Sequence, residues 1–384
     1  MRRPLSFLRS GWLCLLFLVF SACPVSAASK VVIASAGASG YLMEHNLPSV
    51  ALAVAMEADL IKQDLVLTSD GQVIVFRDPT LERVTNVAEL FPGRSREDGR
   101  YHVLDFTLDE IRQLSLHDPA GLFPADLHPR LTIPTLNEEL AMIRGLEKTL
   151  QRTIPIAPEI KQPWLYRKEG HDISQLTLTI LRDHGYTGQE DNVFILSFDA
   201  EELQRLANEL LPAMGMSVKL IQLIDSNEGS EIMVEEWGEL VSYNYDWMFS
   251  KSGLRSLKGY AAGIGLNKSM LADDTTTLLR PNFVEDAHQL GMFVYTLAGQ
   301  KEAQPMVPFV NSLDKEFDFF YFTVGVDGIV TDFCGEGVRF LKNRSQNALP
   351  APEKISTPAL GGEASLQLPL SPQLPQQPDR ENLE

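Results

Sequence analysis

Charged side chains interrupt two short apolar segments of this sequence. Glu159 and Lys161 flank Ile160 in one of them, and Lys62 and Asp64 stand two residues apart in the other. Residues two apart on a β-strand share a face, so the members of each pair would point the same way. Burial of an unpaired charge is costly. The pattern therefore indicates a site in which acidic and basic groups face one another or bind an ion.

Polar residues also stand in or just after the C-terminal halves of most predicted strands. They are Ser35, Lys62, Asp64, Arg77, Asp78, Glu159, Lys161, Gln222, Asn267 and Asp332. In a (β/α)8 barrel the C-terminal ends of the strands meet on one face, which carries the active site. For any single position, the simpler explanation is that polar residues begin where a strand ends. For the charged pair Glu159 and Lys161, we favour a functional site over this simpler explanation.

The elements that would position these residues alternate along the chain. Apolar, β-rich runs predict strands at 31–35, 60–66, 73–76, 154–160, 193–198, 218–224, 262–266, 292–297 and 328–331. Amphipathic segments predict helices at 47–56, 108–116, 136–145, 174–184, 200–211, 281–290 and 335–342. Near-continuous apolar strands followed by helices predict an α/β fold with a parallel sheet. A barrel needs eight strands, so we expect one of the nine to be a hairpin partner or a misassignment.

Two regions depart from this alternation. Residues 227–247 interrupt the rhythm and carry a cluster of aromatic residues, which predicts an insertion. Residues 343–384 are rich in Pro, Gln and Ser, contain no aromatic residue and show no sustained periodicity. That composition predicts a disordered C-terminal tail. The body from residue 28 to residue 342 is long enough for one large barrel or for two small domains.

The N-terminal residues 1–27 have the features of a signal peptide. A basic start precedes an apolar run over 11–20 that is too short to span a bilayer, and Val25-Ser26-Ala27 provides a small-residue cleavage site. We therefore expect the chain to be exported to the periplasm. In the alternative interpretation the segment is a lipoprotein signal, and the mature protein is tethered to the membrane through Cys23.

Charge and cysteine content exclude some classes of partner and cofactor. The formal net charge is -18 at pH 7, which repels nucleic acid and anionic membrane surfaces. We therefore expect no nucleic-acid partner. Beyond the signal peptide, Cys334 is the remaining cysteine. One cysteine supports neither an internal disulfide nor a cysteine metal cluster.

Residues 31–46 read VVIASAGASGYLMEHN, and from Ser35 onward this segment resembles the opening motif of the glycerophosphodiester phosphodiesterase family. In the periplasmic branch that motif reads His-Arg-Gly-Ala-Ser-Gly-Tyr-Leu-Pro-Glu-His-Thr. The residues from Gly37 to Leu42 match it, as do Glu44 and His45. Ser35 stands in place of the histidine and Ala36 in place of the arginine. The scaffold of the motif is kept, whereas its two most reactive members are replaced.

Further motifs extend the resemblance from about Val31 to Lys342. Gln63-Asp64 matches a Glu-Gln-Asp strand of the family except at its first position, and Pro158-Glu159-Ile160-Lys161 is intact. The segments 76–85, 91–94, 98–101, 105–108, 243–248 and 330–333 also match motifs of this branch. The sequence is therefore identified as a member of the family. The resemblance implies a TIM-type (β/α)8 barrel with a family-type insertion.

The resemblance also implies a metal site. In this branch of the family, three carboxylates hold a Ca²⁺ ion, which suits a hard cation. Asp64 and Glu159 occupy two of these positions, and Lys62 occupies the third. We favour the hypothesis that the Lys62 ammonium takes the place of the metal by pairing with both carboxylates. The alternative is that Lys62 points elsewhere and a two-carboxylate metal site survives.

The remaining positions implied by the resemblance concern the substrate. Two histidines act as general acid and base in the family, and their positions carry Ser35 and Arg77 here, so no catalytic histidine is intact. The resemblance implies that Lys161 would help to hold the phosphate of the substrate. Glu44, Lys161, Lys62 and Tyr295 are expected to line the substrate pocket. Tyr295 would form an apolar wall for a glycerol group or pack in the core.

Three functional hypotheses follow. Proton transfer by a positioned side chain contributes roughly 10²–10⁴-fold to a rate, so replacing both histidines would remove most of the activity. We favour an exported, non-catalytic member of the family that binds a small anionic or phosphodiester ligand. The second hypothesis is an active enzyme that hydrolyses glycerophosphodiesters to glycerol 3-phosphate and an alcohol. The third is an altered hydrolase that uses Asp64, Glu159 or His45, although for His45 we favour a structural hydrogen-bonding role.

Overall fold

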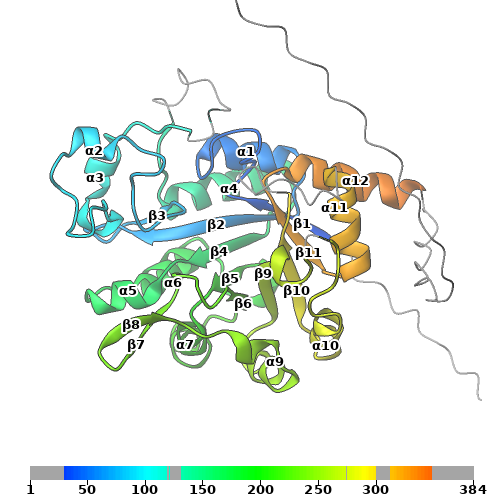
Figure 1. Cartoon of the computed structure of the whole chain (residues 1–384). Helices are drawn as coiled ribbons and strands as arrows, with labels where there is room; N and C mark the ends of the chain where they lie inside the picture. Colours follow the sequence, from blue (N-terminus) through cyan, green and yellow to red (C-terminus); the bar gives the residue numbers. More distant parts are fainter. Residues whose placement is uncertain (1–29, 119–120, 122–130, 274, 300–311, 348–384) are drawn as a thin grey trace, which may run out of the picture. The chain divides into compact units, whose positions relative to one another are not determined.

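The computed structural model describes residues 30–118, 121, 131–273, 275–299 and 312–347. Within these residues the chain forms a closed barrel of strands with helices on its outside (Figure 1). The order of the sheet is β1-β11-β10-β9-β6-β5-β4-β2-β3, and an additional pairing of β1 with β2 closes it. The predicted signal peptide 1–27, with Cys23, and the predicted tail beyond residue 347 lie outside the described residues.

The barrel strands coincide with the predicted strands apart from small shifts at their ends. They are β1 (Val31–Ser35), β2 (Leu60–Leu67), β3 (Val73–Val75), β4 (Ile156–Ile160), β5 (Phe194–Ser197), β6 (Lys219–Ile224), β9 (Gly263–Asn267), β10 (Phe293–Leu297) and β11 (Gly328–Thr331). β3 pairs antiparallel with β2 and is the expected hairpin partner. The eight other strands of this sheet pair in parallel, which confirms the TIM-type (β/α)8 barrel and excludes two small domains for the described residues.

The strands are apolar on both faces because both faces are buried. Ile33 and Leu60 point into the barrel, where they pack in one cluster with Tyr295. Their neighbours Val32 and Ile61 point the other way, into the layer between the barrel and its helices. Successive side chains of a strand alternate between faces, and a parallel sheet covered by helices gives neither face to water. A continuous apolar run is the sequence signature of that arrangement.

Helices follow most of the strands and cover the barrel. They are α1 (Leu47–Ala55), α2 (Val87–Leu90), α3 (Leu108–Ile111), α4 (Leu136–Leu150), α5 (Pro163–Lys168), α6 (Ile173–Asp183), α7 (Ala200–Arg205), α8 (Leu211–Ala213), α9 (Lys251–Lys258), α10 (Phe283–Gln289), α11 (Leu313–Asp318) and α12 (Cys334–Asn347). A π-helical stretch over 206–210 joins α7 to α8. At the start of α4, Thr135 and Glu138 form a capping box, which satisfies two backbone N–H groups of the first turn.

The helices predicted over 108–116 and 136–145 end at other residues in the structure. The helix predicted over 108–116 ends at Ile111, because Leu116 forms an isolated β-bridge with Thr85. The helix predicted to end at residue 145 continues to Leu150, since a glycine inside a helix weakens it without ending it. The first error comes from a tertiary contact, and the second comes from a weak local signal.

The C-terminal boundary of the body also needs correction. α12 runs to Asn347, so the predicted end of the body at residue 342 falls inside this helix. Its last turns are tied to the rest of the body by two ion pairs, Lys342 with Glu57 and Arg344 with Asp318. The first five residues of the predicted tail, 343–347, are therefore helical.

The predicted insertion contains a hairpin that is separate from the barrel sheet. β7 (Met233–Glu236) and β8 (Glu239–Ser242) pair antiparallel in a two-stranded sheet of their own. Trp237 and Gly238 form the turn, with φ of 55° and 88°. Positive φ at both central residues is typical of the tight turns that join two strands directly. The Trp237 side chain is fully exposed at this turn.

No helix among the described residues is both long enough and apolar enough to cross a membrane. Cys334, the cysteine beyond the predicted signal peptide, is buried and free. Burial raises the pKa of its thiol to about 11. Because the thiolate is the reactive form of cysteine, this side chain acts as a small core residue.

A buried carboxyl group lies between α4 and the outside of the barrel. Glu139 of α4 is completely buried, and its polar neighbour is Gln63, which points outward from β2 between Lys62 and Asp64. Burial raises the pKa of Glu139 to about 7, and Gln63 opposes that increase only in part. The folded state therefore binds a proton that the unfolded chain releases near pH 4.5.

This group makes a pH-dependent contribution to stability that the substitution Glu139→Gln should remove. Because the folded pKa is raised, ionisation of Glu139 destabilises the fold as pH rises from about 4.5 through about 7. Relative to the native chain, we expect the variant to gain about 2–3 kcal/mol more at pH 8 than at pH 5. Urea denaturation at both pH values measures this difference. The exposed Glu89 provides the control, since Glu89→Gln should change stability equally at both; an equal response of the two variants would refute the prediction.

Candidate functional site

The site begins at the end of β1, where the chain makes a tight left-handed turn. Ala36 and Gly37 have φ of 55° and 81°. A Cβ atom on Gly37 would lie 2.8 Å from the backbone of Ser49 in α1, so a side chain does not fit here. The turn leads to His45, which also has a positive φ, of 49°. This close packing of the turn on α1 positions His45 at the C-terminal ends of the strands.

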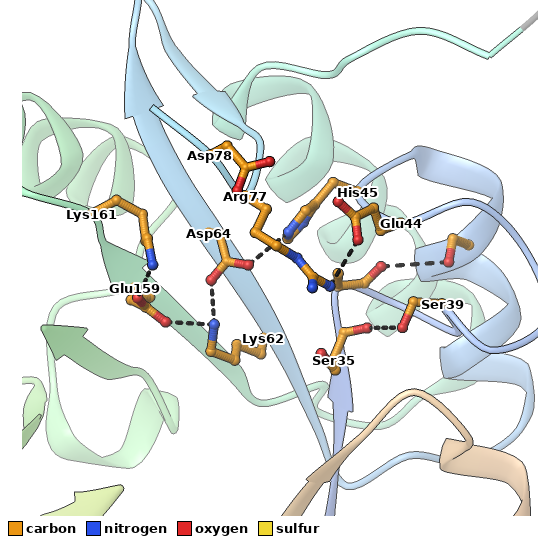
Figure 2. A network of polar contacts seen from close by, with 12 residues as sticks. Ser35, Ser39, Glu44, His45, Lys62, Asp64, Arg77, Asp78, Glu159 and Lys161 are labelled. Carbon is orange, nitrogen blue, oxygen red and sulfur yellow. Dashed lines mark hydrogen bonds and ion pairs between the residues drawn. The ribbon is translucent and has the colours of Figure 1, made fainter. Parts of the chain in front are cut away.

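Two neighbouring strands supply the central charges of the site. Lys62 and Asp64 lie on β2, and Glu159 lies on β4 directly in register with Asp64. The Lys62 ammonium contacts the Asp64 carboxylate and lies 2.5 Å from Oε2 of Glu159 (Figure 2). Both carboxylates are buried, with exposed fractions of 5% and 3%. One ammonium group therefore joins two carboxylates on adjacent strands.

Lys62 and Asp64 stay charged because they lie close to opposite charges, although burial by itself opposes the charged forms. Burial by itself raises the pKa of Asp64, but the charge of Lys62 and the contact with His45 outweigh burial and hold that pKa well below its usual range. Burial likewise lowers the pKa of Lys62, but Asp64 and Glu159 outweigh it and raise that pKa. Lys62 and Asp64 therefore form a true ion pair at neutral pH.

His45 is turned inward toward the same carboxylate. Its Nε2 lies 2.8 Å from Oδ2 of Asp64, and the imidazole is 2% exposed. An ionised carboxylate can only accept hydrogen bonds, so Nε2 of His45 carries the hydrogen and donates it to Asp64. This contact orients the imidazole. His45 therefore makes a buried hydrogen bond, which is the kind of role we favoured for it from the sequence.

Lys161 forms the other end of the charge network. It follows β4, and its Nζ lies 2.9 Å from Oε1 of Glu159 and 2.6 Å from Oε1 of Glu231. The Phe198 ring lies 5.6 Å from the same Nζ. Burial lowers the pKa of Lys161, but Glu159 and Glu231 outweigh it and raise that pKa well above its usual range. Lys161 is therefore a buried ammonium with two carboxylate partners.

Glu231 comes from the insertion rather than from a barrel strand. Its backbone oxygen accepts a hydrogen bond of 3.0 Å from Nε1 of Trp164, and the adjacent Ile232 is buried. Burial raises the pKa of Glu231, and repulsion by Glu159 adds to this, whereas Lys161 opposes it. The net pKa is raised, so the environment favours a charged Glu231 less than it favours Asp64.

A second group of charges lies beside the first. Arg77 lies 2.8 Å from Oε2 of Glu44, Arg83 contacts Oε1 of the same residue, and Arg83 Nε lies 2.5 Å from Asp78. Burial raises the pKa of Glu44, but Arg77, His45 and Arg83 outweigh it and lower that pKa. Glu44 was expected to line the cavity, but its partner Arg77 lines it instead. Arg77 cannot act as a general base, since a guanidinium stays protonated in proteins.

These residues surround a cavity at the C-terminal ends of the strands. Its volume is about 230 Å³. The apolar floor is the barrel interior, where Leu223 and Tyr295 contribute side chains. One wall carries the charges of Lys62 and Lys161 with their partners. The cavity therefore offers an apolar surface and a polar surface to one small molecule.

The structure brings most of the predicted polar set to this cavity. The predicted residues that line it are Ser35, Lys62, Asp64, Arg77, Glu159, Lys161, Asn267 and Tyr295. Gln222 does not, because its amide accepts a hydrogen bond from Tyr260 and donates to backbone carbonyls near the end of β5. Asp332 accepts a hydrogen bond from Ser39, and Asp78 pairs with an arginine. These three residues hold local structure together beside the cavity.

The residues at the expected calcium position do not fit a divalent cation. Calcium takes six to eight oxygen ligands, whereas Asp64 and Glu159 direct their oxygens to the ammonium of Lys62. Across the described residues, no group of three or more His, Cys, Asp or Glu side chains could hold a metal ion. A cation at this position would have to displace Lys62 from both carboxylates.

Sequence reasoning missed Glu231 and Phe198 as cavity residues. Both line the cavity beside Lys161. Phe198 follows β5 at the position where the other strands place polar residues, so its place after a strand was an available signal. Glu231 lies in the insertion, and no periodicity there indicates which side chain turns back toward the barrel. Its role depends on a contact between segments 70 residues apart.

Comparison with known proteins agrees with this architecture. A sequence model of the glycerophosphoryl diester phosphodiesterase family matches residues 36–336. A glycerophosphodiester phosphodiesterase of Haemophilus influenzae is 38% identical over 331 residues, which cover 82% of this chain and 90% of that protein. One of Treponema pallidum is 37% identical over 344 residues, which cover 84% of this chain and 95% of that protein.

Solved structures show the same fold. A putative glycerophosphoryl diester phosphodiesterase of Silicibacter pomeroyi superposes with a TM-score of 0.58 at 20% identity, over 82% of this chain and 94% of that chain. A phosphodiesterase of Oleispira antarctica in complex with the product sn-glycerol-3-phosphate superposes with a TM-score of 0.55 at 19% identity, over 82% of this chain and 97% of that chain. With its barrel and its match from residue 36 to residue 336, this chain belongs to the glycerophosphoryl diester phosphodiesterase family.

Proposed function

We propose that this chain is a non-catalytic member of its family that binds a small anionic or phosphodiester ligand in the barrel cavity. The observation that carries the proposal is the position of Lys62, whose ammonium joins Asp64 and Glu159. Those two carboxylates are the ones that the family resemblance assigns to the metal. An ammonium neutralises them without providing the Lewis acid that would polarise a phosphoryl group.

The residues at the two expected histidine positions support the same conclusion. Ser35 stands at the first of them, and a serine hydroxyl is a weak nucleophile without an adjacent base. Arg77 stands at the second, is engaged with Glu44 and keeps its proton. If both acid–base groups are replaced, roughly 10²–10⁴-fold of rate is lost for each proton-transfer role. Binding of a ligand needs none of these groups.

A second candidate function is an active or altered hydrolase. The similar proteins from Haemophilus influenzae and Treponema pallidum are named glycerophosphodiester phosphodiesterases. If this chain shares their activity, it would hydrolyse glycerophosphodiesters to glycerol 3-phosphate and an alcohol. The contact between His45 and Asp64 favours it, because a carboxylate-oriented imidazole is a competent acid or base. The metal would then have to bind with Lys62 displaced.

Hydrolysis of glycerophosphocholine by the purified full chain distinguishes the two candidates. We expect no release of glycerol 3-phosphate above that of Asp64→Ala, either with calcium or with a chelator. The variant is a fair control only if it is folded, which circular dichroism verifies. Turnover by the native chain that Asp64→Ala abolishes would overturn the non-catalytic proposal, and a requirement for calcium would show that the metal displaces Lys62.

We also propose that the chain is exported and works in the periplasm. The basic start, the apolar run over 11–20 and the small-residue site at 25–27 support cleavage of a signal peptide. Tethering through Cys23 is the alternative. Fractionation of cells that express the native chain or Cys23→Ala decides between them, since a lipid-anchored protein leaves the membrane fraction only when Cys23 is replaced.

A further inference from the structure

The two buried lysines of the cavity already have carboxylate partners. Lys62 contacts Asp64 and Glu159. Lys161 lies 2.9 Å from Glu159 and 2.6 Å from Glu231. An anion that enters the cavity must therefore compete with a carboxylate of the chain itself. The question is which of these three carboxylates gives way.

Glu231 is the carboxylate whose position depends least on the barrel. Asp64 and Glu159 are fixed on paired strands, whereas Glu231 precedes the hairpin of β7 and β8. Among the described residues, that hairpin forms a two-stranded sheet apart from the barrel sheet. Gln162 and Trp164 donate hydrogen bonds to the backbone oxygens of Ser230 and Glu231, so we expect the side chain of Glu231 to turn away while its backbone stays in place. Movement of Glu231 would leave the barrel pairing intact.

Glu231 is also incompletely satisfied where it lies. Its Oε1 contacts Lys161, but its Oε2 is buried and has no hydrogen-bond partner within the described part of the chain. Burial of a polar atom without a hydrogen-bond partner is unfavourable, because its contact with water is lost and not replaced. Lys161 in turn keeps Glu159 as a partner when Glu231 leaves. Displacement of Glu231 therefore gives up one contact and relieves one unfavourable burial.

We propose that Glu231 acts as an internal anion on Lys161 and that a small phosphate monoester replaces it. This inference rests on the proposed binding function and names its ligand class. To displace a carboxylate, the ligand needs more charge or more acceptor oxygens than a carboxylate offers, and a phosphate monoester has both. The cavity of about 230 Å³ leaves room for a polyol or apolar group beside Leu223 and Tyr295.

The proposal predicts a defined change in affinity. When a competing group occupies the binding position, the apparent dissociation constant equals the intrinsic one divided by the fraction of open sites. Removal of the Glu231 contact should bring that fraction close to one. We expect Glu231→Gln to bind sn-glycerol 3-phosphate at least about tenfold more tightly than the native chain, which corresponds to occlusion of about nine sites in ten.

Isothermal titration of the purified full chain with sn-glycerol 3-phosphate tests this. Glu231→Asp keeps the charge but shortens the side chain, so it should bind more tightly as Glu231→Gln does. The exposed Glu235 on β7 provides the matched control: Glu235→Gln removes the same charge and should stay within about twofold of the native affinity, since screened surface charges interact weakly. Adding Lys161→Met to Glu231→Gln should abolish binding, with the melting temperature showing that the protein is folded.

The outcomes separate this inference from the proposed function. Equal tightening by Glu231→Gln and Glu235→Gln, or a Glu231→Asp variant that binds like the native chain, would show a general charge effect and overturn the role of Glu231. Native-like affinity in every Glu231 variant would overturn it too, while leaving anion binding intact. Absence of binding in all folded variants would overturn both the inference and the proposed anion ligand. Hydrolysis by the native chain would overturn the non-catalytic function alone.

Discussion

Replacement of Lys62 by methionine is expected to destabilise the barrel by about 3–5 kcal/mol at neutral pH, because it leaves a buried ion cluster without its central cation. The Lys62 ammonium contacts Asp64 and lies 2.5 Å from Glu159. Methionine fills a similar volume, so the loss of charge is the main change. Urea denaturation of the native chain and of Lys62→Met at pH 7 measures the effect.

The destabilisation caused by Lys62→Met should depend on pH. Lys62 holds the pKa of Asp64 below its usual range, so the pair contributes stability above the unfolded pKa that is lost as pH falls through the folded pKa. In Lys62→Met the carboxylates take up protons more easily, and the difference from the native chain should shrink toward pH 4. A difference that stays constant with pH would contradict an electrostatic origin.

A surface lysine provides the matched control. Lys251 lies 2.9 Å from Asp286 with 69% of its side chain exposed, and exposed ion pairs contribute roughly 0–1 kcal/mol. Lys251→Met should therefore cost far less than Lys62→Met. In addition, Asp64→Asn and Glu159→Gln introduced together into Lys62→Met should recover much of the lost stability, since they remove the uncompensated charges.

Replacement of Lys62 by glutamate is expected to create a calcium site. The substitution puts a third carboxylate beside Asp64 and Glu159, which lie in register on β2 and β4, and carboxylate oxygens suit calcium. Without calcium the variant should be less stable than the native chain through like-charge repulsion. Calcium at about 100 times its dissociation constant should return about 2.7 kcal/mol. Melting curves with calcium and with a chelator measure this gain.

Lys62→Gln separates the added ligand from the lost ammonium. It removes the cation without adding a carboxylate, so calcium should leave its melting temperature nearly unchanged. Calcium stabilisation of the native chain as large as that of Lys62→Glu would show that two carboxylates suffice. That result would also show that the Lys62 ion pairs yield to metal, and the second candidate function would gain support.

The sequence alone predicts the barrel because its signal is local. Both ends of β1 are predicted correctly, because the apolar run begins at Val31 and ends at the turn after Ser35. Nine strands are predicted where a barrel needs eight, so one strand is expected to be extra. That strand is β3, which pairs antiparallel with β2. By contrast, Leu116 leaves its predicted helix for a bridge to Thr85. That contact joins two segments that no local pattern connects.

For the site, the sequence predicts which charges stand at the ends of the strands, whereas the contacts among those charges depend on how the strands and loops pack. Period-two alternation places Lys62 and Asp64 on one face, but their approach to Glu159 depends on the pairing of β2 with β4. The inward turn of His45 depends on the positive φ of that residue. Glu231 reaches Lys161 from the insertion after β6, because β4, β5 and β6 lie side by side in the sheet and the segments after them meet at one end of the barrel. A contact between residues 70 positions apart produces no periodic pattern in the sequence.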